Sequence, residues 1–165
     1  MGFKRLLNHL LMTDWQVKRA FAPSVLAKIE QAIQASELAH AGEIRFAVEG
    51  ALGILPLVEG QDARSRAIEV FSQLHVWDTQ HNNGLLIYVL LADRAVEIVA
   101  DRGINARVQP GEWDAVCQAI KTAFGNRQFE AGSVAGIDAV SSHLARHFPA
   151  HPSSGNELPD QPVVL

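Results

Sequence analysis

Four polar side chains at the ends of apolar segments have the chemistry of a divalent-cation site. They are Glu43, Asp78, Asn83 and Asp101. If segments 44–49 and 85–91 are parallel strands and 96–100 returns antiparallel, all four lie at the edge of the sheet where the parallel strands begin. Carboxylate and amide oxygens are the ligands that Ca²⁺ and Mg²⁺ prefer, so the pattern predicts binding of one of these ions.

The same four residues also have a purely structural interpretation. Asp and Asn side chains commonly cap helices and close loops through hydrogen bonds to the main chain. Clustered carboxylates raise one another's pKa unless a cation compensates their charge. Ligands of open α/β sheets usually bind at the opposite edge, where parallel strands end. Cation binding and capping therefore both remain open at this point.

The familiar catalytic motifs are absent from the sequence, which assigns no catalytic residue. There is no Gly-Lys-Ser/Thr phosphate loop, no G-x-G-x-x-G and no H-E-x-x-H. Cys117 is the single cysteine and sits in an apolar helical pattern, which predicts a buried thiol and excludes a disulfide framework. His143 and His147 are four residues apart on a predicted helix, where they either share a metal or form a solvated last turn.

The elements that position these residues follow from hydrophobic periodicity. Segment 44–49 alternates as a half-buried strand, and the unbroken apolar run 85–91 is typical of a strand covered on both faces. Residues 92–94 are long enough only for a tight turn, so 96–100 completes a hairpin. The stretch 50–60 has no strong period and is predicted as a loop. Amphipathic patterns and capping signals predict helices over 3–11, 13–20, 23–41, 62–74, 113–124 and 134–144.

These elements predict an α/β fold: a three-layer α/β/α sandwich with extra N-terminal helices. Its small mixed sheet contains a βαβ unit and a hairpin. With 165 residues, 48% of them hydrophobic, the chain is expected to form one domain over 1–149. Four of the seven prolines fall between 149 and 162, so 150–165 is predicted to be an extended, poorly ordered tail.

Charge and hydropathy exclude several classes of partner. A net charge of −4 gives no electrostatic footprint for nucleic acid or for anionic lipid, and no stretch approaches the ~20 apolar residues of a membrane span. We therefore expect a cytoplasmic protein that is not membrane-embedded. The apolar stripe of helix 3–11, together with Trp15, either packs into the core, docks a partner or lies on a membrane surface.

Several ordered motifs resemble the small soluble bacterial branch of the TPM-domain family over residues 3–149. These motifs are Gly42-Glu43-Ile44-Arg45, Trp77-Asp78-Thr79, Asn83-Gly84-Leu85-Leu86-Ile87-Tyr88-Val89, Asp101-Arg102-Gly103-Ile104 and His147-Phe148-Pro149. The resemblance implies a compact α/β/α sandwich and Ca²⁺ or Mg²⁺ bound by Asp78, Asn83 and Asp101, with Glu43 as a weaker ligand. It also implies a membrane-protein partner of the LemA type and carries a phosphatase label.

The resulting hypothesis is a TPM-like domain that binds a divalent cation and a protein partner. The first alternative is a metal-dependent acid phosphatase acting on phosphate esters, in which the metal polarises the phosphoryl group and Arg102 helps to hold the phosphate. The second is a structural adaptor that acts through its N-terminal amphipathic helices.

Overall fold

A computed structural model describes residues 2–109, 111–151 and 155–165. Its described part contains a four-stranded mixed sheet in the order β3-β2-β1-β4. The strands are β1 (Glu43–Glu49), β2 (Gly84–Leu90), β3 (Ala95–Ala100) and β4 (Val163–Val164). Strand β1 runs parallel to β2 and to β4, whereas β2 and β3 are antiparallel. The predicted hairpin and the parallel strand pair of the βαβ unit are confirmed.

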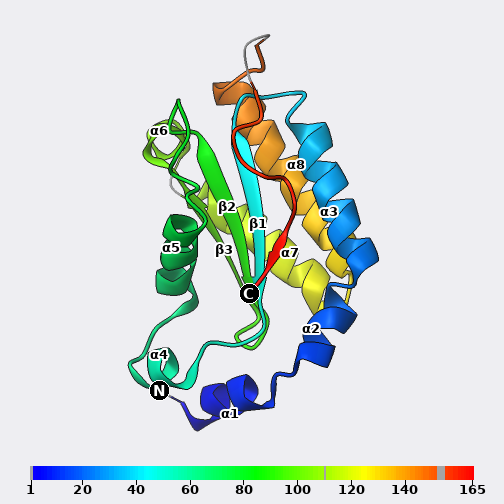
Figure 1. The fold of residues 1–165 in the computed structure, drawn as a ribbon, viewed down its shortest axis with the longest axis vertical. Helices are drawn as coiled ribbons and strands as arrows, with labels where there is room; N and C mark the ends of the chain where they lie inside the picture. The colour runs from blue at the N-terminus through cyan, green and yellow to red at the C-terminus, as the bar shows by residue number, and fades with distance from the viewer. Residues whose placement is uncertain (1, 110, 152–154) are drawn as a thin grey trace.

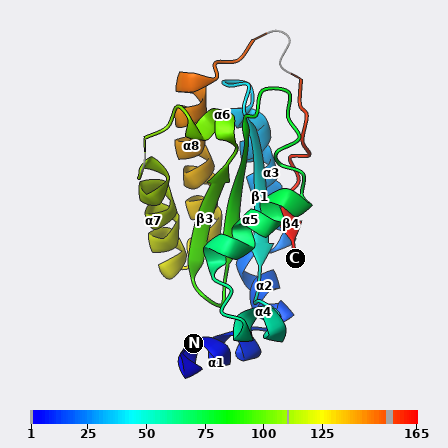
Figure 2. The ribbon, with the colours of Figure 1, turned by 90° about the vertical axis from the view of Figure 1, so that its left-hand side faces the viewer.

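Helices cover both faces of the sheet (Figures 1 and 2). They are α1 (Phe3–Leu11), α2 (Asp14–Ala20), α3 (Pro23–Ser36), α4 (Ile54–Val58), α5 (Ala63–Gln73), α6 (Arg102–Asn105), α7 (Glu112–Gly125) and α8 (Phe129–His147). Helices α3, α7 and α8 pack together on one face, and α5 packs on the other against β2 and β3. The three-layer α/β/α architecture is confirmed.

Each face of the sheet contributes to its own hydrophobic core. Ile44, Phe46 and Val48 of β1 pack toward α3, α7 and α8, while Ala47 packs toward α5. All seven residues of β1 are buried, so the prediction of a half-buried strand is wrong. The polar positions of β1 are covered because α5 and the C-terminal segment lie over them; Arg45, for example, donates a hydrogen bond to Gln161 O at 3.2 Å.

Some helices begin or end at other residues than predicted, because short local signals determine these boundaries. Thr13 and Gln16 form the predicted capping box of α2. Helix α3 ends at Ser36 rather than near residue 41. A single helical turn, α4, lies in the stretch predicted as a loop, and α6 begins where the Asp101 side chain caps it. One-turn helices have too few residues to show a hydrophobic period, which explains why the sequence pattern missed both.

The C-terminal segment, residues 155–165, is extended but packs along the sheet instead of forming a free tail, and residues 152–154 of the predicted tail lie outside the described residues. Ala47 and Val48 pair with β4, and Leu165 N–H donates to Val48 O at 2.9 Å. Leu158 is buried in the same core as α5. The segment therefore covers the side of β1 that would otherwise be an exposed strand edge. None of the helices in the described part of the chain has the length and apolar character that a membrane span requires.

Candidate metal-binding edge of the sheet

The amino edge of the sheet, where β1 and β2 begin, brings together three of the four predicted residues. Glu43 N–H donates to Asn83 O at 3.1 Å, and Asp101 N–H donates to Gly84 O at 2.8 Å. The main chains of Glu43, Asn83 and Asp101 are thus neighbours. Asp78 is exposed in the loop that follows α5, where its N–H donates to His75 O at 2.9 Å.

Two buried side-chain oxygens at this edge have no hydrogen-bond partner among the described residues. The Asn83 Nδ2 group donates to Ala41 O, which fixes the orientation of the amide and leaves Oδ1 unpaired. Asp101 Oδ1 accepts the Arg102 N–H at 2.7 Å and so begins α6, while Asp101 Oδ2 is unpaired. Leaving such an oxygen buried without a partner costs about 1–3 kcal/mol, and a bound cation would supply the missing partner.

The loop before β2 is held tightly against the start of α6. Gly103 N–H donates to Asn82 O at 3.1 Å. A Cβ atom added at Gly103 would lie 2.5 Å from Asn82 O and 2.9 Å from His81 O, so only glycine allows this approach. Arg102 Nε also donates to Asn82 Oδ1 at 3.1 Å. Main-chain carbonyl oxygens of the loop therefore lie beside the helix that Asp101 caps.

Glu43, the fourth predicted ligand, directs its carboxylate to a different place. Its Oε2 accepts the Leu158 N–H of the C-terminal segment at 3.1 Å. It lines a cavity of about 280 Å³ together with Glu37, His40 and Asp160. Burial raises the pKa of Glu43, and burial together with the charges of Glu43 and Asp160 raises the pKa of Glu37 to about 8. The residues that line this acidic cavity do not include Asn83 or Asp101.

The donor set decides which kind of cation fits the amino edge. Among the described residues, no three or more His, Cys, Asp and Glu side chains are arranged to hold a metal ion. A cation here would depend on Asp101, the amide oxygen of Asn83, loop carbonyls and water. Mg²⁺ commonly binds through one or two carboxylates and keeps several waters, and Ca²⁺ also accepts carbonyl ligands. The residues present fit a hydrated hard cation and not a thiolate- or imidazole-bound one.

The other candidate groups have ordinary structural partners. His143 Nδ1 lies 2.8 Å from Glu112 Oε2, and its ring packs against Trp113. This contact places a carboxylate beside His143, but without hydrogen-bond geometry between the two atoms. Cys117 is buried, which confirms the prediction of a buried thiol, and burial raises the pKa of the thiol to about 11.

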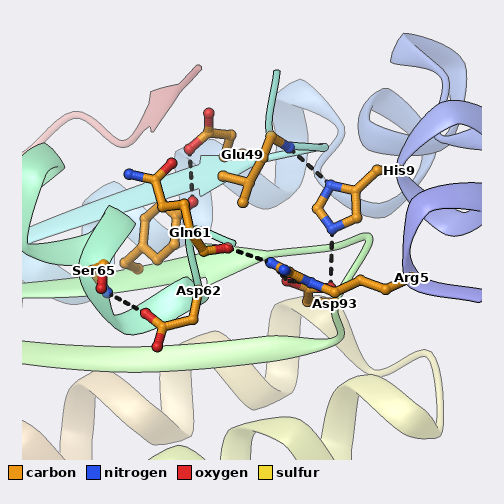
Figure 3. Close-up of polar contacts among 9 residues, drawn as sticks. Arg5, His9, Glu49, Gln61, Asp62, Ser65 and Asp93 are labelled. Carbon is orange, nitrogen blue, oxygen red and sulfur yellow. Dashed lines mark hydrogen bonds and ion pairs between the residues drawn. The ribbon is translucent and has the colours of Figure 1, made fainter. Parts of the chain in front are cut away.

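A polar network that the sequence analysis missed lies at the opposite edge, where β1 and β2 end (Figure 3). Glu49 accepts hydrogen bonds from Tyr88 Oη at 2.6 Å and from Arg66 Nε at 2.9 Å. Asp93 accepts hydrogen bonds from Arg5 and contacts His9. The sequence did contain a signal for this network, because the charged residue Glu49 ends an otherwise largely apolar strand. Because these groups satisfy one another, the network holds α1 and α5 on the sheet.

Comparison with known proteins identifies the family. The family model of the TPM domain matches residues 17–143. The chain belongs to the TPM-domain family. It is similar to BA42 of the psychrophilic bacterium Bizionia argentinensis, with 33% identity, a TM-score of 0.76, and coverage of 86% of this chain and 93% of that one. The resemblance found in the sequence motifs is thereby confirmed.

Two further solved structures share the fold of this TPM-domain protein at low identity. An N-terminal domain from P. gingivalis is 20% identical with a TM-score of 0.57, covering 73% of this chain and 76% of that one. The N-terminal domain of cg2496 from Corynebacterium glutamicum is 16% identical with a TM-score of 0.53, covering 87% and 79%. None of the curated proteins matches the chain.

Proposed function

We propose that this TPM domain is a cytoplasmic divalent-cation-binding domain whose site is the amino edge of the sheet. The observation that carries the proposal is the pair of buried, unpaired oxygens, Asn83 Oδ1 and Asp101 Oδ2. Both belong to the set that the sequence pattern singled out for Ca²⁺ or Mg²⁺. Asp78, exposed on the same loop, is available to complete the site through its side chain or a bound water.

A cation at this edge would add a further link between segments that the two hydrogen bonds to Asn82 already join. It would join the loop 78–83 to the start of β2 and, through Asp101, to α6. The loop and α6 would then present one fixed surface to a protein partner. A membrane protein of the LemA type, which the family resemblance implies, is the partner that we propose to test against this surface.

Phosphate-ester hydrolysis is the second candidate function, and the position of Arg102 favours it. Its Nε is held by Asn82 Oδ1 beside Asp101, which leaves the terminal nitrogens of the guanidinium for a bound anion. A divalent metal would polarise the phosphoryl group and position the attacking water, since the sequence assigns no nucleophilic residue. Arg102→Ala should then abolish turnover of a phosphate ester while leaving cation binding intact.

The test is a titration of EDTA-treated protein with Ca²⁺ and with Mg²⁺, followed by backbone amide NMR and by melting temperature. We expect saturable shifts in 78–83 and 101–105 and a higher melting temperature. Asp101→Asn keeps the helix-capping oxygen but removes the charge, and should weaken binding at least tenfold. Asp62→Asn is the matched control because Asp62 caps α5 in the same way, far from the site. Equal affinities in the two variants, or no shifts at millimolar cation, would contradict the proposal.

A further inference from the structure

Helix α1 is attached to the domain by its polar side. Asp93, in the turn between β2 and β3, lies 2.8 Å from Arg5 Nη2 and 2.9 Å from His9 Nε2 (Figure 3). The other ring nitrogen of His9 accepts the Leu52 N–H at 3.0 Å, and His9 is buried. These contacts fix the rotation of α1 about its axis, with the side chains of Arg5 and His9 turned inward.

Most of the apolar side of α1 consequently faces outward, although Leu6 packs against the core on the α5 side. Phe3 is 80% exposed and Leu11 is 63% exposed, and Leu7 and Leu10 are exposed as well. An amphipathic helix of a free-standing water-soluble domain has the reverse orientation, with its apolar stripe on the core. Exposed apolar area is unfavourable by roughly 25 cal/mol per Å², so this orientation is stabilised when an apolar medium covers the helix.

The exposed apolar surface continues beyond α1. Trp15 of α2 is 64% exposed, and Leu55 of α4 is 74% exposed. Helix α1 lies across one end of the elongated molecule, with α4 beside it in both views (Figures 1 and 2). We call this surface the apolar tip; it comprises Phe3, Leu7, Leu10, Leu11, Trp15, Ile54, Leu55 and Val58.

Basic residues accompany the apolar tip. The first twenty residues contain four basic residues and one acidic residue, although the whole chain has a net charge of −4. Arg5 is paired with Asp93, but Lys4, Lys18 and Arg19 are exposed. The Arg19 guanidinium lies 5.2 Å from the centre of the Trp15 ring. Exposed positive charge thus accompanies the apolar side chains of α1 and α2, and the acidic Asp14 and Glu59 are also exposed at the tip.

We propose that the apolar tip docks on an anionic lipid bilayer, with its Leu, Phe and Trp side chains entering the headgroup region. Leucine and aromatic side chains flanked by Lys and Arg form the composition of helices that lie in a membrane interface. The basic residues of the tip would attract anionic lipid, whereas the acidic remainder of the molecule would be repelled by it. Helix α1 and Trp15 lie outside the residues matched by the TPM-domain model, whereas the α4 residues of the tip lie inside them.

Vesicle flotation of the full chain tests the proposal, with phosphatidylcholine vesicles compared with vesicles that contain phosphatidylglycerol as well. We expect flotation with the anionic vesicles and at least tenfold less in 0.5 M NaCl or with neutral vesicles. The double variant Leu10→Glu/Leu11→Glu should abolish flotation. Its control, Leu38→Glu/Ile68→Glu, makes the same exchange at exposed apolar residues outside the tip and should float like the unmodified protein. Circular dichroism checks that both variants are folded.

Two results would overturn the proposal. One is the absence of flotation with anionic vesicles, and the other is flotation that the double variant leaves unchanged. If the protein does not float but forms a dimer that Leu10→Glu/Leu11→Glu dissociates, the tip is covered by a second copy of the chain instead of by lipid. Neither result would affect the cation site at the other end of the sheet, which is tested independently.

Discussion

At the scale of single residues, Asp93 and Glu37 show how environment sets opposite charge states for two carboxyl groups. Partial burial disfavours the charged form of Asp93, but hydrogen bonds from Arg5 and His9 outweigh burial and hold its pKa below the ordinary value. Glu37 is half-buried beside two other carboxyl groups, and its pKa is raised to about 8. One group stabilises the fold as an anion and the other as a neutral acid.

Asp93→Asn should destabilise the protein by about 1–3 kcal/mol, because it weakens a part-buried ion pair that joins α1 to the sheet. The pKa of Asp93 is lowered in the folded state, so its contribution is present above the ordinary Asp pKa of 3.8 and is lost as pH falls through the lowered value. Denaturant unfolding of the unmodified protein and of the Asp93→Asn variant at pH 7 and pH 3 measures this contribution to stability. Glu69→Gln, which removes an exposed ion pair of Arg66, should cost less than about 0.5 kcal/mol. Equal effects of the two variants would show that α1 is not held by Asp93.

Glu37→Gln should remove part of the pH dependence of stability. Because the folded state holds the proton of Glu37 more tightly than the unfolded state, the stability of the unmodified protein falls as pH rises from 4.5 to about 8. The neutral variant lacks this loss, and at pH 9 it should be more stable by on the order of 1 kcal/mol, allowing for solvent screening of a half-buried group. Melting temperatures from pH 5 to 9 measure the difference, with exposed Glu130→Gln as the control. A variant whose pH profile matches the unmodified protein would rule out a raised pKa at Glu37.

At the scale of elements, the C-terminal segment completes the sheet and one of its cores. Strand β4 is only two residues long, so main-chain pairing alone holds it weakly. Leu158, buried against the α5 side, and its N–H bond to Glu43 anchor the segment further along. Side-chain burial and strand pairing therefore both hold the segment at the edge of β1.

Leu158→Ala should cost about 2–3 kcal/mol and release the segment from β1, since the side chain fills a core position. Amide hydrogen exchange of Leu165, whose N–H donates to Val48 O, reports the release directly. Leu38→Ala, at a highly exposed leucine, is the matched control and should change neither quantity. Unchanged protection of Leu165 in the Leu158 variant would mean that β4 holds the segment by itself.

The long elements could be predicted from the sequence, and the short ones could not. Periodicity found the central strand 85–91 and the helix 62–74 because each repeats its pattern over several residues. It missed α4, α6 and β4, whose stability comes from capping and from tertiary contacts. At the candidate site, strand directions correctly brought Glu43, Asn83 and Asp101 to one edge. The direction of the Glu43 carboxylate was not predictable, because the segment it binds is 115 residues further along the chain.

At the scale of the whole molecule, the two ends of the sheet differ in chemistry. The amino edge carries unpaired oxygens, an arginine and close-packed loops, whereas the opposite end carries a satisfied ion-pair network and the apolar tip. The three-layer core between them is continuous and buried on both faces of β1 and β2. A cation at one end and a lipid surface at the other could be bound at the same time, because no residue is shared between them.

Anomalous diffraction from crystals soaked in Mn²⁺ would show whether the amino edge of the sheet binds a divalent cation. Mn²⁺ has the oxygen preference of Mg²⁺ and an anomalous signal that locates it without reference to the protein. We expect a peak within coordination distance of Asp101 Oδ2 and Asn83 Oδ1, which Asp101→Asn removes. A peak only among Glu37, Glu43 and Asp160, or no peak at all, would contradict it.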